Sequence, residues 1–168
     1  SRITKETNPE ILFHTDATQA VGRQTLMLED QLRHVDLLSL SGHKLHAPKG
    51  IGALFVRRGT PLRPFLIGGH QENNRRAGTQ NVPYIVALGK AVALSTAHIL
   101  ENEPRIQALR DRLEHSLVEQ IPYLQVNGGA APRLANTLNI ACHCIEGESI
   151  LEQLNAEGIC ASSGSACT

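Results

Sequence analysis

The chain has 168 residues, of which 41% are hydrophobic and 19% are charged, a composition typical of a globular protein. Sixteen basic residues balance sixteen acidic ones, whereas proteins that bind nucleic acid usually carry a basic surplus or a basic stripe with aromatic residues. No apolar run approaches the roughly 20 residues that a membrane helix needs, and we see no secretory leader. We therefore expect a cytoplasmic protein that binds neither nucleic acid nor a membrane.

The first part of the chain is expected to form a sheet covered on both faces. Short apolar runs with little alternation predict strands at 11–14, 35–40 and 51–56. A long helix is expected to follow, with Asn81 as its cap and Pro83 in its first turn. These elements place residues 1–100 in the α/β class.

The last part of the chain is expected to be a small α+β unit, residues 101–168. A helix is predicted from about Pro104 to just before Pro122, because its apolar residues recur at helical spacing. A turn is indicated at 127–129, followed by a strand at 135–142. A short amphipathic helix is predicted at 148–157, and Gly158 is well placed to end it.

All cysteines lie in the last quarter of the chain: Cys142, Cys144, Cys160 and Cys167. In a reducing compartment we expect thiols and not disulfides. Cys142, His143 and Cys144 could form part of a metal site, but no second Cys/His pair follows at the spacing of structural zinc sites. The alternative interpretation is that Cys142 and Cys144 are alternate residues of a strand.

A lysine in the segment Ser41-Gly42-His43-Lys44 is the first candidate for chemistry. The segment follows a predicted strand, and ligands bind in the loops after strand ends in α/β sheets. A lysine there can act as a Schiff-base amine if its surroundings lower its pKa, and Ser41 and His43 are suitable donors to a phosphate. Lys44 could equally be a solvated loop lysine.

Asp16 and Gln19, which follow the first predicted strand, add independent weight. Pyridoxal phosphate requires a carboxylate that keeps its pyridine nitrogen protonated, so that the ring remains an electron sink. Asp16 could be that partner, and Gln19 could donate to the ring hydroxyl oxygen. The alternative interpretation is that Asp16 caps a helix beginning near Ala17.

Taken together, these segments resemble the cysteine desulfurases of the class V aminotransferase family, specifically the NifS/IscS type. The pattern H-x-D-A-x-Q-A-x-G spans 14–22, S-G-H-K spans 41–44 and P-K-G-I-G-A-L spans 48–54. R-A-G-T-Q-N-V-P follows at 76–83, N-T-L-N-I at 136–140 and S-S-G-S-A-C-T at 162–168. The resemblance covers essentially the whole chain. It implies part of a fold type I large domain with a mostly parallel sheet, followed by part of a small α+β domain.

The resemblance also implies how pyridoxal phosphate is held. Lys44 corresponds to the lysine that carries the cofactor as a Schiff base. Asp16 corresponds to the partner of the pyridine nitrogen and Gln19 to the contact with the ring hydroxyl. Ser41 and His43 correspond to phosphate contacts. No metal ligand is implied.

Two further positions resemble residues that act beyond this cofactor pocket. Thr79 corresponds to the residue that reaches the phosphate of the neighbouring subunit's cofactor, which implies a homodimer. Cys167 corresponds to the nucleophile that takes the sulfur of L-cysteine as a persulfide while alanine is released. The implied partners are L-cysteine and a sulfur-acceptor protein such as an iron–sulfur scaffold.

Family members are considerably longer, and the chain begins at Ser1 and stops directly after a Ser/Gly-rich stretch. We therefore expect a piece of a longer protein, in which other segments supply the group that stacks on the cofactor and the arginine that binds the substrate carboxylate. Three alternatives stay open. They are another class V enzyme such as a selenocysteine lyase or an aminotransferase, a non-catalytic interaction module, and a metal site formed by His14, Asp16, His43 and Cys142. The roles of His14, His70 and Arg76 are not assigned by the motifs.

Overall fold

The computed structural model describes residues 1–164 and divides the chain into two compact units, Ser1–Glu103 and Pro104–Thr168. In the first unit the elements are α1 (Arg2–Thr7), β1 (His14–Asp16), β2 (Leu37–Ser41), the 3-10 helix η1 (Gly42–Leu45), β3 (Gly52–Val56) and α2 (Val82–Ala97). Helix α3 (Ile99–Gln120) begins before the boundary between the units. The second unit continues with β4 (Leu124–Val126), β5 (Ile140–Cys142) and α4 (Gly147–Ala156).

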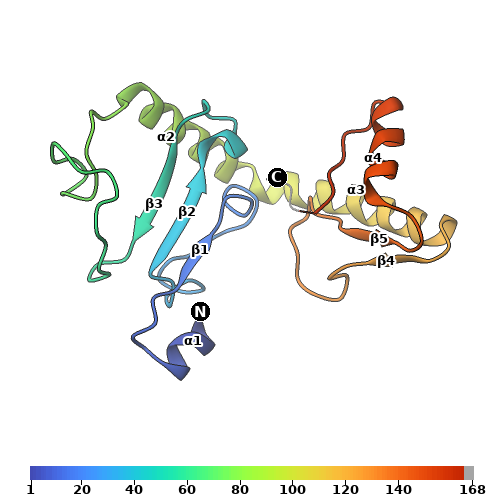
Figure 1. Ribbon diagram of the computed structural model, residues 1–168, viewed down its shortest axis with the longest axis horizontal. Coiled ribbons are helices and arrows are strands. Elements are labelled where there is room, and N and C mark those ends of the chain that lie inside the picture. The colour runs from blue at the N-terminus through green and yellow to red at the C-terminus, as the bar shows by residue number, and fades with distance from the viewer. Residues whose placement is uncertain (165–168) are drawn as a thin grey trace. The chain divides into compact units, whose positions relative to one another are not determined.

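The first unit contains a three-stranded sheet in the order β1-β2-β3 (Figure 1). Strands β1 and β2 are parallel, with His14 opposite Leu37 and Asp16 opposite Ser39. Strands β2 and β3 are antiparallel, with Leu38 opposite Phe55. The α/β class predicted from the sequence is confirmed, and within residues 1–164 the sheet is mixed, with one parallel and one antiparallel pairing.

Two apolar clusters hold this unit together. Helix α2 contributes Leu88 and Ala91, which pack on Leu45 and Ala47 in and just after η1. The second cluster is formed by the buried residues Ala17, Val35 and Leu38, with Phe13 and Phe55 among the side chains packed against it. Both clusters use the sheet face that carries Leu38 and Leu40. The helix is anchored at its start because the Asn81 Oδ1 atom accepts a hydrogen bond of 3.3 Å from the amide of Tyr84.

The short helix α1 is tied to the sheet by an ion pair. The Nζ atom of Lys5 lies 2.8 Å from Oδ2 of Asp36, and these side chains are only 17% and 13% exposed. The same ammonium donates to the carbonyl of Ile11 at 2.7 Å, and the Asp36 carboxylate accepts from the Phe13 amide at 2.7 Å. The pair therefore orders the segment that leads into β1.

Arg57, the residue after β3, joins the strand to the segment that precedes β2. Its Nε atom donates to the carbonyl of Val35 at 2.8 Å, and its Nη2 atom donates to the carbonyls of Leu28 and Leu32 at 2.9 and 3.0 Å. Its guanidinium also lies 5.4 Å from the centre of the Phe55 ring. Because carbonyls outside regular structure need donors when they are partly buried, this arginine replaces the backbone ladder there.

In the second unit β4 and β5 form an antiparallel pair, with Leu124 opposite Cys142. Two arginines connect α3 to the segment between these strands. Arg110 donates to the carbonyl of Leu134 at 3.0 Å, and Arg133 forms an ion pair with Glu114 of α3. Gly158 has φ +76°, and Ile159 donates back to the carbonyl of Leu154 at 2.8 Å, so α4 ends where the glycine predicted it.

The structure shifts three of the predicted boundaries. The strand expected at 11–14 begins only at His14, because the amides of Ile11 and Phe13 are bound to Asn8 and Asp36 and not to a strand. The strand expected at 135–142 is confined to 140–142, because the amide of Thr137 folds back onto the carbonyl of Leu134 at 3.1 Å. Helix α3 starts at Ile99 and includes Pro104, which costs one backbone hydrogen bond without ending the helix.

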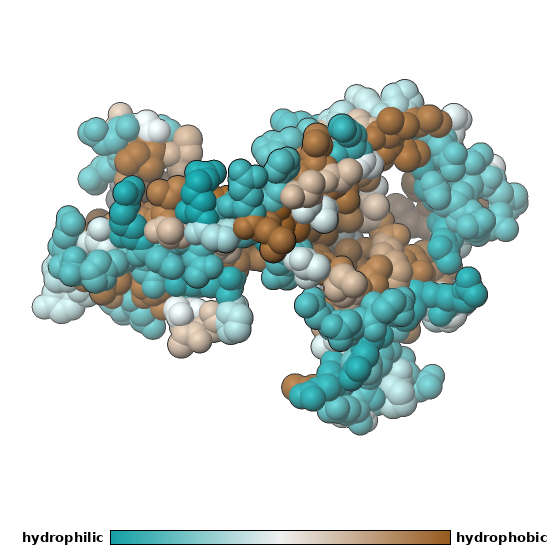
Figure 2. All heavy atoms as spheres, turned by 180° about the vertical axis from the view of Figure 1, so that it is seen from behind, coloured by the Kyte–Doolittle hydropathy of each residue, from teal (hydrophilic) through white to brown (hydrophobic). Residues whose placement is uncertain are grey.

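Apolar residues reach the surface of the molecule among polar ones (Figure 2), and several of them belong to the segment that joins β3 to α2. Phe65 is 95% exposed and Ile67 is 92% exposed, with Leu66 between them at 54%. No single helix within residues 1–164 is long and apolar enough to span a membrane, and α2 and α3 meet the length and hydropathy requirement only when counted together.

Candidate functional site

The carboxyl ends of β1 and β2 meet at one edge of the sheet because the two strands are parallel. Asp16 ends β1, and the segment Ser41–Lys44 begins where β2 ends. The Ala17 amide donates to the carbonyl of Ser39 at 2.9 Å, which keeps the chain beside β2 just past Asp16. The tertiary structure therefore brings the two sequence motifs with the strongest chemical signal to the same edge.

The carboxylate of Asp16 is exposed, and Thr18, two residues further along the chain, stabilises its ionised form. Its Oδ1 atom accepts a hydrogen bond of 2.8 Å from the amide of Thr18. Hydrogen bonds from Thr18, and to a smaller degree the charge of His14, lower the pKa of Asp16 below its ordinary value, against a small opposing effect of desolvation. A side chain in this state is suited to face a protonated ring nitrogen.

The 3-10 helix η1 is a tight turn that depends on a glycine. The amide of Gly42 donates to the carbonyl of Ile51 at 2.8 Å, and the carbonyl of Gly42 accepts from Ala47 at 3.0 Å. A Cβ atom on Gly42 would lie 2.8 Å from Cγ2 of Ile51 and 2.9 Å from its carbonyl oxygen. Only glycine allows this close approach, which explains the glycine in S-G-H-K.

The polar side chains of this turn lie close together. The Oγ atom of Ser41 is 2.7 Å from Nδ1 of His43, so each can orient the other as a hydrogen-bond partner. Lys44 is half-buried, between the exposed His43 and the buried Leu45. Because Leu45 packs beneath α2, the lysine is held on a fixed piece of backbone.

Gly22 anchors the turn from the other side. A Cβ atom there would lie 2.7 Å from Cδ2 of Leu45 and 2.8 Å from Cβ of Ser95 in α2, and the residue has φ +75°. The first motif, which ends at Gly22, is therefore packed directly against the second motif and against α2. The glycine links the two halves of the candidate site.

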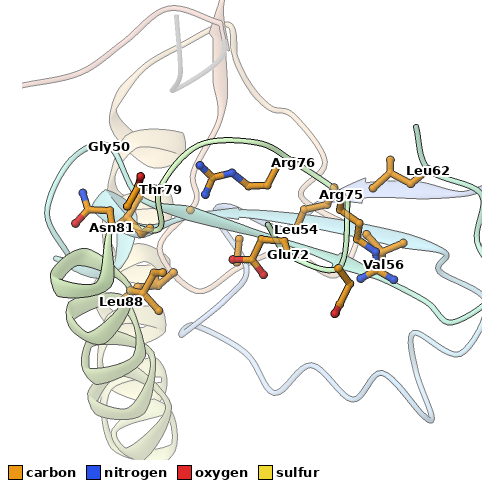
Figure 3. Close-up of a pocket in the computed structure, with 15 residues that line it drawn as sticks. Gly50, Leu54, Val56, Leu62, Glu72, Arg75, Arg76, Thr79, Asn81 and Leu88 are labelled. Atoms are coloured by element: carbon orange, nitrogen blue, oxygen red, sulfur yellow. The ribbon is translucent and has the colours of Figure 1, made fainter. Parts of the chain in front are cut away.

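Thr79 lines a cavity of about 640 Å³ beside β3. Figure 3 shows Thr79 near Gly50 and Asn81 at one end of this cavity and Arg75 near Val56 at the other. Arg76 also lines the cavity, but its guanidinium donates to the backbone carbonyls of Ala77 and Gly78 in its own loop. Lys44 is not among the residues that line the cavity.

The structure thus places the candidate residues in two groups. The first lies at or just beyond the carboxyl ends of β1 and β2 and comprises Asp16, Gln19, Ser41, His43 and Lys44. Thr79 lines the cavity beside β3. Cys167 lies outside the described residues. No cluster of three or more His, Cys, Asp or Glu side chains that could hold a metal ion occurs in residues 1–164, so the geometry lends nothing to the metal interpretation.

One residue at the site could not be assigned from the sequence alone. Ser39 lies directly opposite Asp16 in the parallel pairing, and its Oγ atom is 3.2 Å from Nε2 of His14. A signal was present, since Ser39 is a polar residue inside the apolar strand 35–40. Its neighbour in space depends on strand register, which the local pattern does not contain.

The chain is similar to known proteins along its whole length. The family description "Aminotransferase class-V" matches residues 1–168. The chain is 59% identical over 157 residues to "Cysteine desulfurase 2" of Trichormus variabilis, covering 94% of this chain and 39% of that protein. It is 52% identical over 158 residues to "Cysteine desulfurase NifS" of Azotobacter vinelandii, with the same coverage.

Solved structures show the same fold. A NifS-like protein from Rickettsia africae superposes with a TM-score of 0.87 and 34% identity, over 98% of this chain and 44% of that one. A structure described as "SspA in complex with cysteine" superposes with a TM-score of 0.69 and 32% identity, over 98% of this chain and 44% of that one.

The chain belongs to the class V aminotransferase family. The chain matches cysteine desulfurases over 94% of its own length, and it spans about 39% of theirs. The family and these relatives imply dependence on pyridoxal phosphate.

Proposed function

We propose that this chain is the part of a pyridoxal-phosphate-dependent cysteine desulfurase that carries the cofactor lysine and the nucleophilic cysteine. The whole protein would convert L-cysteine to L-alanine and retain the sulfur as a persulfide on Cys167. The proposal is supported above all by the position of Asp16 and Ser41–Lys44 at one sheet edge, together with 52–60% identity to cysteine desulfurases. Residues 1–100 would then belong to the large domain and residues 101–168 to the small domain.

The side chains at the edge fit the cofactor by their chemistry. Asp16 is an exposed carboxylate held as an anion by Thr18, which suits a protonated pyridine nitrogen. Ser41 and His43 orient each other as donors for a phosphate. Gly42 lets the backbone turn closely at this point, where a Cβ atom would collide with Ile51.

In this proposal each residue has a stated task. Lys44 would hold the cofactor through Nζ and would move the substrate α-proton. Asp16 keeps a proton on the ring nitrogen, and Gln19 donates to the ring hydroxyl oxygen. Ser41 and His43 hold the phosphate.

Bound pyridoxal phosphate supplies an electron sink for the pair of electrons left on the substrate carbon. The Cys167 thiolate attacks the sulfur of L-cysteine, the bond between that sulfur and Cβ breaks, and its electrons remain on the substrate, which takes up protons to become alanine. An ordinary cysteine, with a pKa near ~8.5, already supplies some thiolate at neutral pH.

Thr79 lies in a cavity apart from Lys44, and we propose that it serves the phosphate of a neighbouring copy. The protein would then be a homodimer. We also propose that it is cytoplasmic and that it passes sulfur to an acceptor protein, with iron–sulfur cluster assembly as the first role to examine. Sulfur supply for tRNA thiolation or for nitrogenase maturation would use the same residues.

The test is covalent capture of the cofactor by the full-length protein. We expect pyridoxal phosphate to produce a visible absorbance band, and borohydride reduction followed by peptide mapping to place the label on Lys44. Lys44→Ala should abolish both signals, and Lys49→Ala, which removes an exposed lysine of the same loop, should leave them unchanged. Absence of label on Lys44 in the full-length protein would overturn the proposal.

A second assay separates the reaction from its relatives. With L-cysteine as substrate and an excess of a thiol reductant, which releases the persulfide sulfur as sulfide, we expect alanine and sulfide in equal amounts. Cys167→Ser should bind cofactor normally but form no persulfide. Selenide release from selenocysteine without sulfide release from cysteine would indicate a selenocysteine lyase. Cofactor binding without either product would indicate an aminotransferase.

A further inference from the structure

His14, Asp16 and Ser39 lie on the same face of the sheet. In β1 the residues His14 and Asp16 are exposed and Thr15 between them is half-buried, as expected for side chains that alternate between faces. Ser39 is the residue of β2 opposite Asp16, so its side chain projects to the face that carries Asp16. The proposed function gives a task to Asp16 but none to the other two.

The hydrogen bond between His14 and Ser39 crosses from one strand to the other. Nε2 of His14 lies 3.2 Å from Oγ of Ser39. A serine hydroxyl can accept one hydrogen bond and donate another. When Nε2 carries the imidazole proton and donates to Oγ, the hydroxyl hydrogen of Ser39 is available for an acceptor beside it.

Asp16, which lies opposite Ser39 in the parallel pairing, offers such an acceptor. The Thr18 amide takes one lone pair of Oδ1, and a carboxylate has further lone pairs to offer. His14 is also the titratable side chain whose charge acts on Asp16 within the described residues, and it adds to the effect of Thr18 in lowering the pKa of that carboxyl. Geometry and charge thus act in the same direction.

We propose, building on the proposed function, that His14 and Ser39 are positioning residues for Asp16. The imidazole fixes the Ser39 hydroxyl next to the carboxylate, and the pair keeps Asp16 anionic and oriented for the pyridine nitrogen of the cofactor. His14 acts by its charge and by orienting the Ser39 hydroxyl, so the effects of the two residues on Asp16 are coupled.

The first experiment needs no cofactor. The full-length apoprotein is labelled with carboxyl-¹³C aspartate, the Asp16 resonance is assigned with Asp16→Asn, and its titration is followed by NMR. We expect His14→Gln and Ser39→Ala each to raise the pKa of Asp16 by about 0.5 unit. Because His14 orients the Ser39 hydroxyl as well as acting by its charge, the double variant should show a shift smaller than the sum of the two single shifts.

Two controls separate positioning from a general loss of structure. Ser39→Thr keeps the hydroxyl and should restore the wild-type titration, and His34→Gln, which removes a half-buried histidine of the first unit, should not change it. A shift in only one of His14→Gln and Ser39→Ala, or in neither, would overturn the inference. Additive shifts in the double variant would overturn it as well.

The second experiment uses the cofactor. We expect His14→Gln and Ser39→Ala to weaken pyridoxal phosphate binding about three- to tenfold, while borohydride still places the label on Lys44. Unchanged affinity in both variants would overturn the inference and leave the proposed function intact. Failure of wild-type Lys44 to capture cofactor would instead overturn the proposed function. The apoprotein titration would still show whether His14 and Ser39 set the pKa of Asp16.

Discussion

Gly22 and Asp36 lie behind the candidate site and connect the segments that carry it. Gly22 lies between Leu45 of the 3-10 turn and Ser95 of α2, so close to both that a Cβ atom would collide with them. Asp36 joins Lys5 of α1 to the Phe13 amide just before β1. Neither residue takes part in the proposed chemistry, so both can be changed to test the framework alone.

Gly22→Ala should destabilise the protein strongly. The new Cβ atom would lie 2.7 Å from Leu45 and 2.8 Å from Ser95, and the residue would keep φ +75°. We expect a loss of about 2–4 kcal/mol in the free energy of unfolding, measured by urea denaturation. Gly59→Ala is the matched control, because Gly59 has φ +89° with no atom within 4 Å of the added Cβ, and it should cost only about 1 kcal/mol. Equal losses in the two variants would contradict the packing argument.

The stability supplied by Asp36 should depend on pH. Partial burial opposes ionisation of Asp36, but the hydrogen bonds from Lys5 and Phe13 and the charges of Lys5 and Arg57 outweigh it and lower the pKa of this carboxyl. A lowered folded-state pKa stabilises the fold above the unfolded value of about 3.9, and the contribution disappears as the pH falls through the folded value.

Asp36→Asn should therefore lower the free energy of unfolding by about 1–3 kcal/mol at pH 7 and by progressively less below pH ~4. Urea denaturation at several pH values measures this difference. Asp30→Asn, which changes an exposed carboxylate of the same unit, serves as the reference. A difference that stays constant from pH 7 to pH ~2 would refute the ionic origin of the effect.

At the scale of elements, the described sheet is held by side chains as well as by its ladder. Strand β1 contributes only residues 14–16, and the segment between β1 and β2 contains no helix or strand. Arg57 supplies donors to carbonyls of that segment, and α2 presses η1 against the sheet through Leu88 and Ala91. The position of the candidate site therefore depends on residues well outside the motifs.

Arg57→Met should loosen the segment before β2. It removes the guanidinium donor from the carbonyls of Leu28, Leu32 and Val35 while keeping much of the side-chain volume. We expect a loss of about 2–4 kcal/mol in the free energy of unfolding, and faster amide hydrogen exchange in residues 28–36. Arg58→Met, at the exposed neighbouring position, should be close to neutral. Similar losses in both variants would point to a general effect of charge.

At the scale of the whole molecule, the proposed homodimer accounts for two features of the first unit. Thr79 lines a cavity that Lys44 does not line. Segment 65–67, in which the Leu66 carbonyl accepts from the Ala77 amide at 3.1 Å, exposes Phe65 at 95% and Ile67 at 92%. Large apolar side chains exposed next to one another are typical of surfaces that bind another protein. A second copy of the chain is the partner that would also give Thr79 its proposed task.

Phe65→Asp should weaken self-association of the full-length protein. We expect the dimer dissociation constant to rise at least about tenfold, because burial of a large aromatic residue at an interface would be replaced by burial of a charge. Sedimentation velocity over a range of concentrations measures it. Ile3→Asp, at a residue of α1 that is 73% exposed, should leave the constant unchanged. An unchanged constant in Phe65→Asp would remove this segment from the interface.

The sequence predicted a large share of the elements, because local signals specify them. Asn81 marks the start of α2, Gly158 marks the end of α4, and the apolar run 51–56 becomes β3 with a shift of one residue. Predictions failed where a tertiary contact competes with a local pattern. The amide of Phe13 binds Asp36 and the amide of Thr137 binds Leu134, so both apolar runs yield shorter strands than their composition suggests.

By itself the sequence determined the family, the α/β class and the candidate roles of Asp16 and Lys44, because these follow from residue types at set spacings along the chain. Only the tertiary structure decided that Ser39 lies beside Asp16, that His14 bonds Ser39, and that Gly22 packs between η1 and α2. Such contacts join residues far apart in the chain, and they are set by strand register and packing across elements, which no local spacing encodes.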